Sequence, residues 1–366
     1  MKKILVSVLA YDGGKSGIAN YIDNVVKELS KEVSIDLIVN EDEVKFFKGI
    51  SPNISFKVVP DSLKKPLYNV LWHLFILPFR IKKDEYDWML LPAGNRRLMS
   101  FYPIKTFVTM HDLSQFNVGK KYDWYRMIYI KKVIPFFLRK VDQIFTVSDN
   151  TAKDMVIHYG MNKKDLIVNY NGVNTESFIP SSLEEKSDKP YILYVARIEH
   201  PGKNHLNLIK AYEMLPRSYK EKYDLYLIGS DWNGAQTVHS YAEKSLDSSR
   251  IKFLGYVENS ALPKYYRRTS LFVFPSFYEG FGIPLVEAMA SGVAIAASFT
   301  SSLPEVGGDA AIYFDPKSSK DISEVMHKIL KDKYCRENMC KLGLEQVKKF
   351  SWKKHVKILL EKAYTA

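Results

Sequence analysis

Two glutamates, Glu279 and Glu287, bracket a glycine-containing loop that runs into the start of an expected helix. The loop contains Gly280 and Gly282, and Pro284 stands in the first turn, where a helix tolerates proline best. Backbone N–H groups at a helix start, with the helix dipole behind them, form a site for phosphate or another anion. Carboxylates accept hydrogen bonds from sugar or ribose hydroxyls. This stretch therefore predicts a site for a molecule that carries both phosphate and hydroxyl groups.

Two cationic residues, Arg197 and Lys203, follow an expected strand at 191–196 and could hold the phosphates of such a molecule. A guanidinium binds an oxyanion through two parallel hydrogen bonds, and a lysine acts as a point charge. The alternative is a pair of solvated surface cations, and the local pattern leaves both interpretations open.

His111 follows the apolar run 107–110, at the end of another expected strand. Its imidazole could donate a hydrogen bond to a sugar hydroxyl near the reacting carbon. A lone histidine in this setting is more often structural, and that alternative stays open.

A glycine loop that includes Gly14 and Gly17 follows the first expected strand, 3–9. Gly14-Lys15-Ser16 resembles the end of a Walker A motif, but Leu9 stands where that motif requires glycine, which argues against a P-loop. The glycines suit a close approach of the backbone to a ligand, with Ser16 as a helix N-cap. A plain turn is the alternative.

Strand-like and helical stretches alternate along both halves of the chain, which predicts two parallel sheets of the α/β class. The expected strands are 3–9, 34–39, 55–59, 88–91, 106–110 and 143–147, then 191–196, 224–228, 251–254, 271–274, 293–297 and 311–314. A polar segment at 180–190 is interpreted as the linker between two Rossmann-like domains.

All the candidate residues follow expected strands, at their carboxyl ends. Ligands of open α/β sheets bind outside these ends, and with two such domains the space between them is the default site. The sequence thus predicts that the glycine loop, His111, the two cations and the glutamate loop serve one cleft.

Length and composition favour a soluble, two-domain enzyme, because 366 residues exceed one ordinary core and 46% are hydrophobic. No run approaches the roughly 18 apolar residues that a membrane-spanning helix needs. The short apolar run of the first ten residues lacks a cleavage site and predicts a strand rather than a signal peptide. Cys335 and Cys340 are the only cysteines, and their spacing suits neither a disulfide nor a metal site, which fits a reducing cytoplasm.

The net charge of +12 is concentrated in one region, since Ser62 to Lys140 contains fifteen basic and five acidic residues. Within it, 64–83 has an apolar centre and basic ends. One interpretation is a buried helix; the other is a surface that binds anionic lipid and presents a lipid-linked acceptor. No nucleic-acid-binding motif accompanies the charge, which argues against nucleic acid. We therefore expect peripheral association with the inner face of the cell membrane.

The E-x7-E pattern from Glu279 to Glu287, within the run 278–292, strongly resembles the signature of the family 4 retaining glycosyltransferases. Supporting similarities are the loop 13–17, His111-Asp112, 171–174 with Phe178, Ala196-Arg197 with Lys203-Asn204, 303–308, and a last helix after Ser351-Trp352. The resemblance implies the GT-B fold, with two Rossmann-like domains facing across a cleft. It implies an acceptor-binding domain over 1–180, rejoined by a C-terminal helix at 350–366, and a nucleotide-sugar-binding domain over 190–349.

The same resemblance implies a role for each candidate residue. Arg197 and Lys203 would hold the donor diphosphate, and Glu287 would bind the ribose hydroxyls. Glu279 and His111 would act at the transferred sugar as the catalytic residues. The remaining donor-binding residues would shape the cleft floor or offer backbone N–H groups; these are Gly14, Gly17, Gly280, Phe281 and Gly282.

The reaction expected from this resemblance is transfer of a hexose, with mannose mildly preferred, from a nucleotide-diphosphate sugar to a glycan or lipid-linked glycan in surface polysaccharide biosynthesis. No D-x-D triplet occurs, so neither a metal nor another cofactor is expected. Front-face transfer is favoured over a covalent intermediate, but both stay open. The alternative function is a nucleotide-sugar 2-epimerase on the same scaffold.

Overall fold

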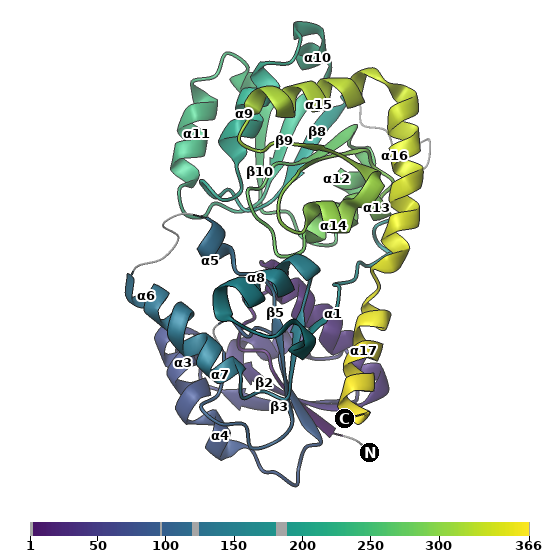
Figure 1. Ribbon diagram of the computed structural model, residues 1–366. Coiled ribbons are helices and arrows are strands. Elements are labelled where there is room, and N and C mark those ends of the chain that lie inside the picture. The colour runs from purple at the N-terminus through teal and green to yellow at the C-terminus, as the bar shows by residue number, and fades with distance from the viewer. Residues whose placement is uncertain (1–2, 96, 119–123, 181–188, 366) are drawn as a thin grey trace. The chain divides into compact units, whose positions relative to one another are not determined.

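The computed structural model describes residues 3–95, 97–118, 124–180 and 189–365. The chain divides into two units, Met1–Gly172 with Trp352–Ala366, and Val173–Ser351. Each unit has its own parallel sheet (Figure 1). The first unit ends at Gly172, earlier than the boundary expected at 180, and the chain returns to it with the C-terminal helix. The expected linker at 180–190 lies mostly outside the described residues.

The sheet of the first unit has seven parallel strands in the order β3-β2-β1-β4-β5-β6-β7. The chain builds outward from β1 to β3 and then resumes on the other side of β1 with β4, so the order reverses between β1 and β4. The strands are β1 (Lys3–Ser7), β2 (Ser34–Asn40), β3 (Ile54–Val59), β4 (Trp88–Leu91), β5 (Thr106–Met110), β6 (Gln143–Thr146) and β7 (Leu166–Val168).

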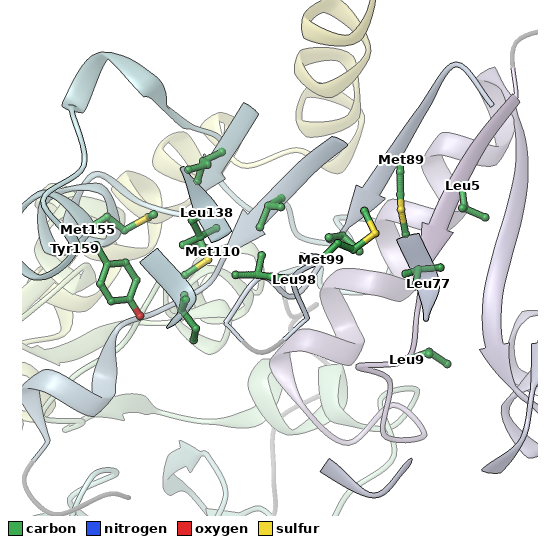
Figure 2. Close-up of a cluster of buried hydrophobic side chains, with 14 of the residues drawn as sticks. Leu5, Leu9, Leu77, Met89, Leu98, Met99, Met110, Leu138, Met155 and Tyr159 are labelled. Atoms are coloured by element: carbon green, nitrogen blue, oxygen red, sulfur yellow. The ribbon is translucent and has the colours of Figure 1, made fainter. Parts of the chain in front are cut away.

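Successive side chains of a strand point to opposite faces of the sheet. Both faces of this sheet are apolar, and helices cover each of them. Ile4 and Val6 of β1 pack in one cluster with α1 (Gly17–Glu32) and α17 (Trp352–Tyr364). Leu5 of the same strand belongs to the cluster on the other face (Figure 2). That cluster includes residues of α3 (Pro66–Phe75), α4 (Leu77–Arg80), α7 (Ile134–Leu138) and α8 (Asp149–Tyr159).

Shorter helical segments complete the first unit. They are η1 (Glu41–Glu43), α2 (Val44–Phe47), η2 (Asp61–Lys64), α5 (Ser114–Asn117), α6 (Trp124–Ile128), a π-helical turn η3 (Tyr129–Val133) and η4 (Lys163–Asp165).

The sheet of the second unit has six parallel strands in the order β10-β9-β8-β11-β12-β13, and its order reverses between β8 and β11. Its strands are β8 (Tyr191–Val195), β9 (Asp224–Ile228), β10 (Ile251–Gly255), β11 (Leu271–Phe274), β12 (Ile295–Ser298) and β13 (Ala311–Phe314). Its helices are α9 (His205–Glu213), α10 (Arg217–Lys222), α11 (Ala235–Glu243), α12 (Leu262–Arg268), α13 (Ile283–Ala290), α14 (Leu303–Gly307), α15 (Ser319–Lys331) and α16 (Lys333–Gln346), with short turns η5 (Ser248–Arg250), η6 (Gly308–Ala310) and η7 (Val347–Lys349).

Every strand that the sequence predicts is present, so the expected α/β class with two Rossmann-like sheets is confirmed. The edge strand β7 was missed, because three residues are too few to show a strand pattern. Cys335 and Cys340 are free thiols. Within the described ranges, no helix is both long and apolar enough to cross a membrane.

Candidate active site

The reversal of strand order between β8 and β11 places the two expected donor-binding segments next to each other. Arg197 and Lys203 follow β8, and the loop with Glu279 follows β11, the neighbouring strand. In open parallel sheets, ligands bind outside the carboxyl ends of strands at such a reversal. The candidate donor site therefore lies within the second unit, at the edge where these two loops meet.

Lys203 and Glu279 form an ion pair at this point. The Lys203 Nζ atom lies 2.8 Å from Oε1 of Glu279, and the two side chains are only 22% and 13% exposed. Residues 76 positions apart in the sequence thus share one site. A phosphate bound to Lys203 would compete with the Glu279 carboxylate for the same ammonium group.

The residues around Lys203 hold its backbone in place. Asn204, which is buried and has a left-handed φ of 60°, donates through its side-chain amide to the carbonyls of Pro275 at 2.9 Å and Pro316 at 2.8 Å. The Tyr194 hydroxyl donates to the Lys203 carbonyl at 2.7 Å. Asparagine tolerates this backbone conformation better than most residues. Asn204 therefore joins the loop after β8 to the loop after β11.

Two serines after β12 hold the loop of Glu279. The Glu279 N–H donates to Ser301 Oγ at 2.9 Å, and Ser302 Oγ donates to the Glu279 carbonyl at 3.0 Å. Ser301 itself has a left-handed φ of 49°. The backbone of Glu279 is thus committed to protein contacts, so a ligand would meet this residue through its carboxylate, which is paired with Lys203.

Gly280, Phe281 and Gly282 lie where the sequence predicts them, directly before α13. Gly282 is the N-cap residue of this helix with φ 94°, a conformation that favours glycine. The Phe281 side chain is buried and its ring lies 5.5 Å from that of Phe350. Phe281 therefore anchors the loop through its side chain, and any contact with a donor would come from the backbone.

Glu287 has a different environment from Glu279. It is only 5% exposed, and its Oε2 accepts a hydrogen bond from the Tyr266 hydroxyl at 2.9 Å. Burial raises the pKa of Glu287 from 4.5 to about 7, although the hydrogen bond from Tyr266 acts in the opposite direction. The two glutamates of the pattern are thus chemically distinct: Glu279 is ion-paired with Lys203, and Glu287 is buried and hydrogen-bonded to Tyr266.

Arg197 is held by residues that the sequence did not single out. Its guanidinium carbon lies 4.8 Å from the ring centre of Trp232, and its Nη2 atom lies 3.7 Å from Oε2 of Glu199. Trp232 belongs to the loop after β9, the strand beside β8. Three neighbouring strands therefore contribute to this one edge.

The glycine loop of the first unit is a structured turn. Asp12 Oδ1 accepts hydrogen bonds from the N–H groups of Lys15 at 3.0 Å and Ser16 at 3.1 Å. Gly14 has a φ of 86°, and Gly17 is the first residue of α1. Ser16 Oγ accepts from the N–H of Ala19, which confirms the predicted N-cap. Gly14 and Gly17 thus lie after β1, beside the reversal of the first sheet.

His111 is nearly buried and is fixed by its surroundings. Its Nε2 lies 2.6 Å from the Pro92 carbonyl, which can only accept, so Nε2 carries the proton and Nδ1 is the acceptor. Burial lowers the pKa of His111, which keeps the ring neutral. A hydroxyl that binds Nδ1 must donate to it. This reverses the expected direction of the hydrogen bond, in which the imidazole donates.

A buried hydrogen-bond chain links α1, β5 and α17 beside His111. The Tyr21 hydroxyl lies 2.9 Å from Thr109 Oγ1 and 3.0 Å from His355 Nε2, and the Tyr21 ring meets His111 edge-on at 4.7 Å. His355 Nδ1 lies 2.9 Å from the Tyr170 carbonyl. No sequence pattern indicates this hydrogen-bond chain, because Tyr21 fits the apolar pattern of its helix and His355 is an isolated histidine.

Comparison with known families identifies both halves of the chain. Residues 175–361 match the model of the family "Glycosyl transferases group 1". Residues 15–177 match the model of the family "Glycosyltransferase Family 4". The O-antigen chain mannosyltransferase B of Escherichia coli is 34% identical over 257 residues, which is 68% of this chain and 67% of that protein.

Other relatives differ in length or are more distant. The serotype-specific mannosyltransferase WbdA of Escherichia coli is 33% identical over 298 residues, which cover 77% of this chain but only 35% of that longer protein. Among solved structures, Anabaena HepE in complex with UDP-glucose has a TM-score of 0.78 at 15% identity, with both chains fully covered. At this identity, the structural similarity establishes the fold alone.

Proposed function

This chain belongs to the group 1 glycosyl transferases, and we propose that it moves mannose from a nucleotide-diphosphate sugar to a glycan or lipid-linked glycan. The observation that carries the proposal is the Lys203–Glu279 pair at the reversal between β8 and β11. A lysine, which is suited to a phosphate, lies there beside a carboxylate, which is suited to sugar hydroxyls. The preference for mannose rests on relatives named as O-antigen mannosyltransferases. The chain matches about a third of the length of WbdA, so this substrate assignment is part of the proposal.

In the proposed reaction, the bond between the sugar C1 and the diphosphate oxygen breaks and a bond from C1 to an acceptor hydroxyl oxygen forms. Arg197 and Lys203 stabilise the negative charge that develops on the departing diphosphate, without a divalent metal. We favour front-face transfer with retention of configuration, in which the acceptor proton passes to the leaving phosphate oxygen. The alternative, a covalent intermediate, would use the Glu279 carboxylate.

The other candidate residues have supporting roles in this proposal. The Glu287 carboxyl group binds the ribose hydroxyls, and Gly280 to Gly282 lie against the sugar or the phosphates. His111 Nδ1 accepts a hydrogen bond from a hydroxyl of the donor sugar. Gly14 and Gly17 leave room for the diphosphate.

The alternative of a nucleotide-sugar 2-epimerase is not favoured, because both family matches and the relatives reported above are transferases. The two functions differ in their need for an acceptor. A transferase releases nucleoside diphosphate in step with glycan growth, whereas an epimerase forms a new sugar nucleotide without an acceptor.

A thermal-shift screen tests the donor assignment. A ligand that binds only the folded protein raises its melting temperature, and GDP, UDP and dTDP are compared at the same concentrations. We expect GDP to raise the melting temperature most and Lys203→Ala to reduce this increase. Stabilisation by none of the three would overturn the nucleotide-sugar assignment.

We further propose that the first unit binds anionic membrane surfaces through the outer face of α3 and α4. Residues on the inner face of these helices are buried, including Trp72, His73 and Leu77. The outer face is apolar yet 44–76% exposed, and consists of Leu67, Tyr68, Leu71, Phe75, Ile76 and Phe79. The two interpretations of 64–83 therefore combine: one face of the helices is buried, and the other is a surface.

Exposed basic residues flank this apolar face on both sides, namely Lys64, Lys65, Arg80, Lys82 and Lys83. Apolar side chains that enter the headgroup region, with lysines beside anionic headgroups, are typical of interfacial helices. Flotation with vesicles containing phosphatidylglycerol is the test. We expect salt-sensitive binding that Leu71→Ser with Phe75→Ser abolishes and that the control Ile157→Ser, an exposed position on α8, retains. Equal flotation of all three proteins would contradict the assignment.

A further inference from the structure

Trp232 is an exposed tryptophan whose backbone is rigidly attached to the donor-site loop. Its side chain is 53% exposed, although it lies on the edge that also carries Arg197. The backbone N–H of Trp232 donates to the Ile198 carbonyl at 2.9 Å, and the backbone N–H of Ile198 donates to the Ser230 carbonyl at 3.0 Å. These bonds continue the pairing of β8 with β9 past the strand ends, so the two loops form one surface.

Two glycines allow this close approach of the loops. A Cβ atom on Gly229 would stand 2.0 Å from the Ala196 carbonyl oxygen, and one on Gly234 would stand 2.9 Å from that of His200. Real side chains do not tolerate such distances from backbone. The loop that carries Trp232 is therefore held at a fixed position against the loop of Arg197.

The Arg197 guanidinium lies between an aromatic ring and a carboxylate. Its carbon is 4.8 Å from the Trp232 ring centre, and its Nη2 atom is 3.7 Å from Oε2 of Glu199, a buried residue. A planar guanidinium stacks on an aromatic ring while its N–H groups remain able to donate in the ring plane. An arginine held in this way loses less rotamer freedom when a phosphate binds.

We propose that Trp232 is a positioning residue that holds Arg197 in place for the donor diphosphate. The inference rests on the proposed function, because it assumes that Arg197 binds phosphate. Trp232 acts through the guanidinium, so its contribution to affinity requires Arg197 to be present. Phenylalanine, which also offers an aromatic face, retains most of the effect, whereas leucine does not.

A double-mutant cycle on nucleotide binding tests this inference. Calorimetric titration with GDP and with UDP is carried out on wild type, Trp232→Leu, Arg197→Ala and the double variant. We expect Trp232→Leu to weaken binding about two- to fivefold, as for a cation–π contact at an exposed site. In the Arg197→Ala background, the same change should have no further effect, since the ring has lost its partner.

Two further variants separate positioning from a general loss of structure. Trp232→Phe should bind within about twofold of wild type. Tyr334→Leu, an exposed aromatic position on α16 of the same unit, should leave affinity and melting temperature unchanged.

Each contrary result has a distinct meaning. An equal effect of Trp232→Leu with and without Arg197 would overturn the inference, because the ring would then contact the nucleotide itself. Failure of wild type to bind either nucleotide would overturn the proposed function, and the inference with it.

Discussion

The Nζ atom of Lys203 lies 2.8 Å from the carboxylate of Glu279, so the cation assigned to the donor phosphates is paired with the carboxylate assigned to the sugar. Both side chains are mostly shielded from water, where a charge pair is weakly screened. A diphosphate that takes Lys203 releases Glu279 from this pair. In the proposed function, the Glu279 carboxylate is then free to contact the transferred sugar.

Glu279 is predicted to act in turnover and not in donor affinity. Glu279→Gln should lower turnover by about 100-fold or more, in the range seen when one charged transition-state contact is lost. It should leave GDP affinity unchanged or tighter, because the phosphate no longer competes with a carboxylate for Lys203. Steady-state kinetics and calorimetry measure the two effects; weaker GDP binding with normal turnover would contradict the assignment.

Glu287 is predicted to act mainly in binding. Glu287→Ala should weaken nucleotide binding about tenfold, as expected when a buried hydrogen-bonding partner is removed. Its effect on turnover at saturating donor should be the smaller one. Nucleosides that lack the ribose hydroxyls should not distinguish the variant from wild type in calorimetric competition. Equal, mild losses in Glu279→Ala and Glu287→Ala would contradict the division of roles.

The buried carboxyl group of Glu287 also predicts a pH-dependent stability. Burial raises the pKa of Glu287 to about 7, above its ordinary value of 4.5. Between these values the folded protein retains a proton that the unfolded chain has released, so stability decreases as pH rises from about 4.5 to about 7. Glu287→Gln is always neutral and can still accept from Tyr266, so it lacks this decrease.

Urea unfolding at pH 4.5 and pH 8 measures this difference. On going from pH 4.5 to pH 8, the free energy of unfolding of Glu287→Gln should increase relative to that of wild type by on the order of 2 kcal/mol. Glu324→Gln, on the exposed side of α15, is the control and should follow wild type. A constant difference between wild type and Glu287→Gln at both pH values would show that Glu287 titrates normally.

The hydrogen-bond chain through Tyr21 is predicted to anchor the C-terminal helix. Tyr21→Phe removes the hydroxyl that joins Thr109 to His355. Thr109 Oγ1 and His355 Nε2, which are both buried, each lose this hydrogen-bond partner. An unsatisfied buried polar group costs about 1–3 kcal/mol, so the first unit should lose about that amount of stability. Burial lowers the pKa of His355 to about 4, so the loss should be nearly constant from pH 6 to pH 8. Unfolding at wild-type urea concentrations would contradict this.

Asn204 is predicted to be essential for the geometry around Lys203. Asn204→Ala removes two hydrogen bonds to buried carbonyls and strains a left-handed backbone, and should cost about 2–4 kcal/mol. Asn204→Gly avoids the backbone strain but lacks the same two hydrogen bonds. Its melting temperature should therefore lie between those of Asn204→Ala and wild type. Both variants should bind GDP more weakly. Wild-type melting temperatures in both would contradict this role.

The strands of both sheets could be predicted from the sequence, because parallel strands are buried on both faces and therefore appear as short apolar runs. The sequence was also sufficient to bring Lys203 and Glu279 to one edge, since both follow strands and β8 and β11 are neighbours. It could not show that the two residues pair, because a side-chain contact over 76 positions depends on both loops.

Other parts of the site depend on contacts that leave no local pattern. Ser301 and Ser302 resemble an ordinary polar turn, although they hold the loop of Glu279. Trp232 is one of five tryptophans, and only the pairing of two loops places it over Arg197. The tautomer of His111 is set by the Pro92 carbonyl, a backbone group that no motif records.

Proton NMR of the purified protein with GDP-mannose and a mannoside acceptor, followed over time, distinguishes mannosyl transfer from epimerisation. We expect GDP to be released in the same amount as a new α-mannosidic anomeric signal appears, and only when acceptor is present. A β-linked product would contradict retention. Formation of a second sugar nucleotide without acceptor, or no GDP release with any glycan acceptor, would contradict the assignment of a mannosyl-transferring enzyme.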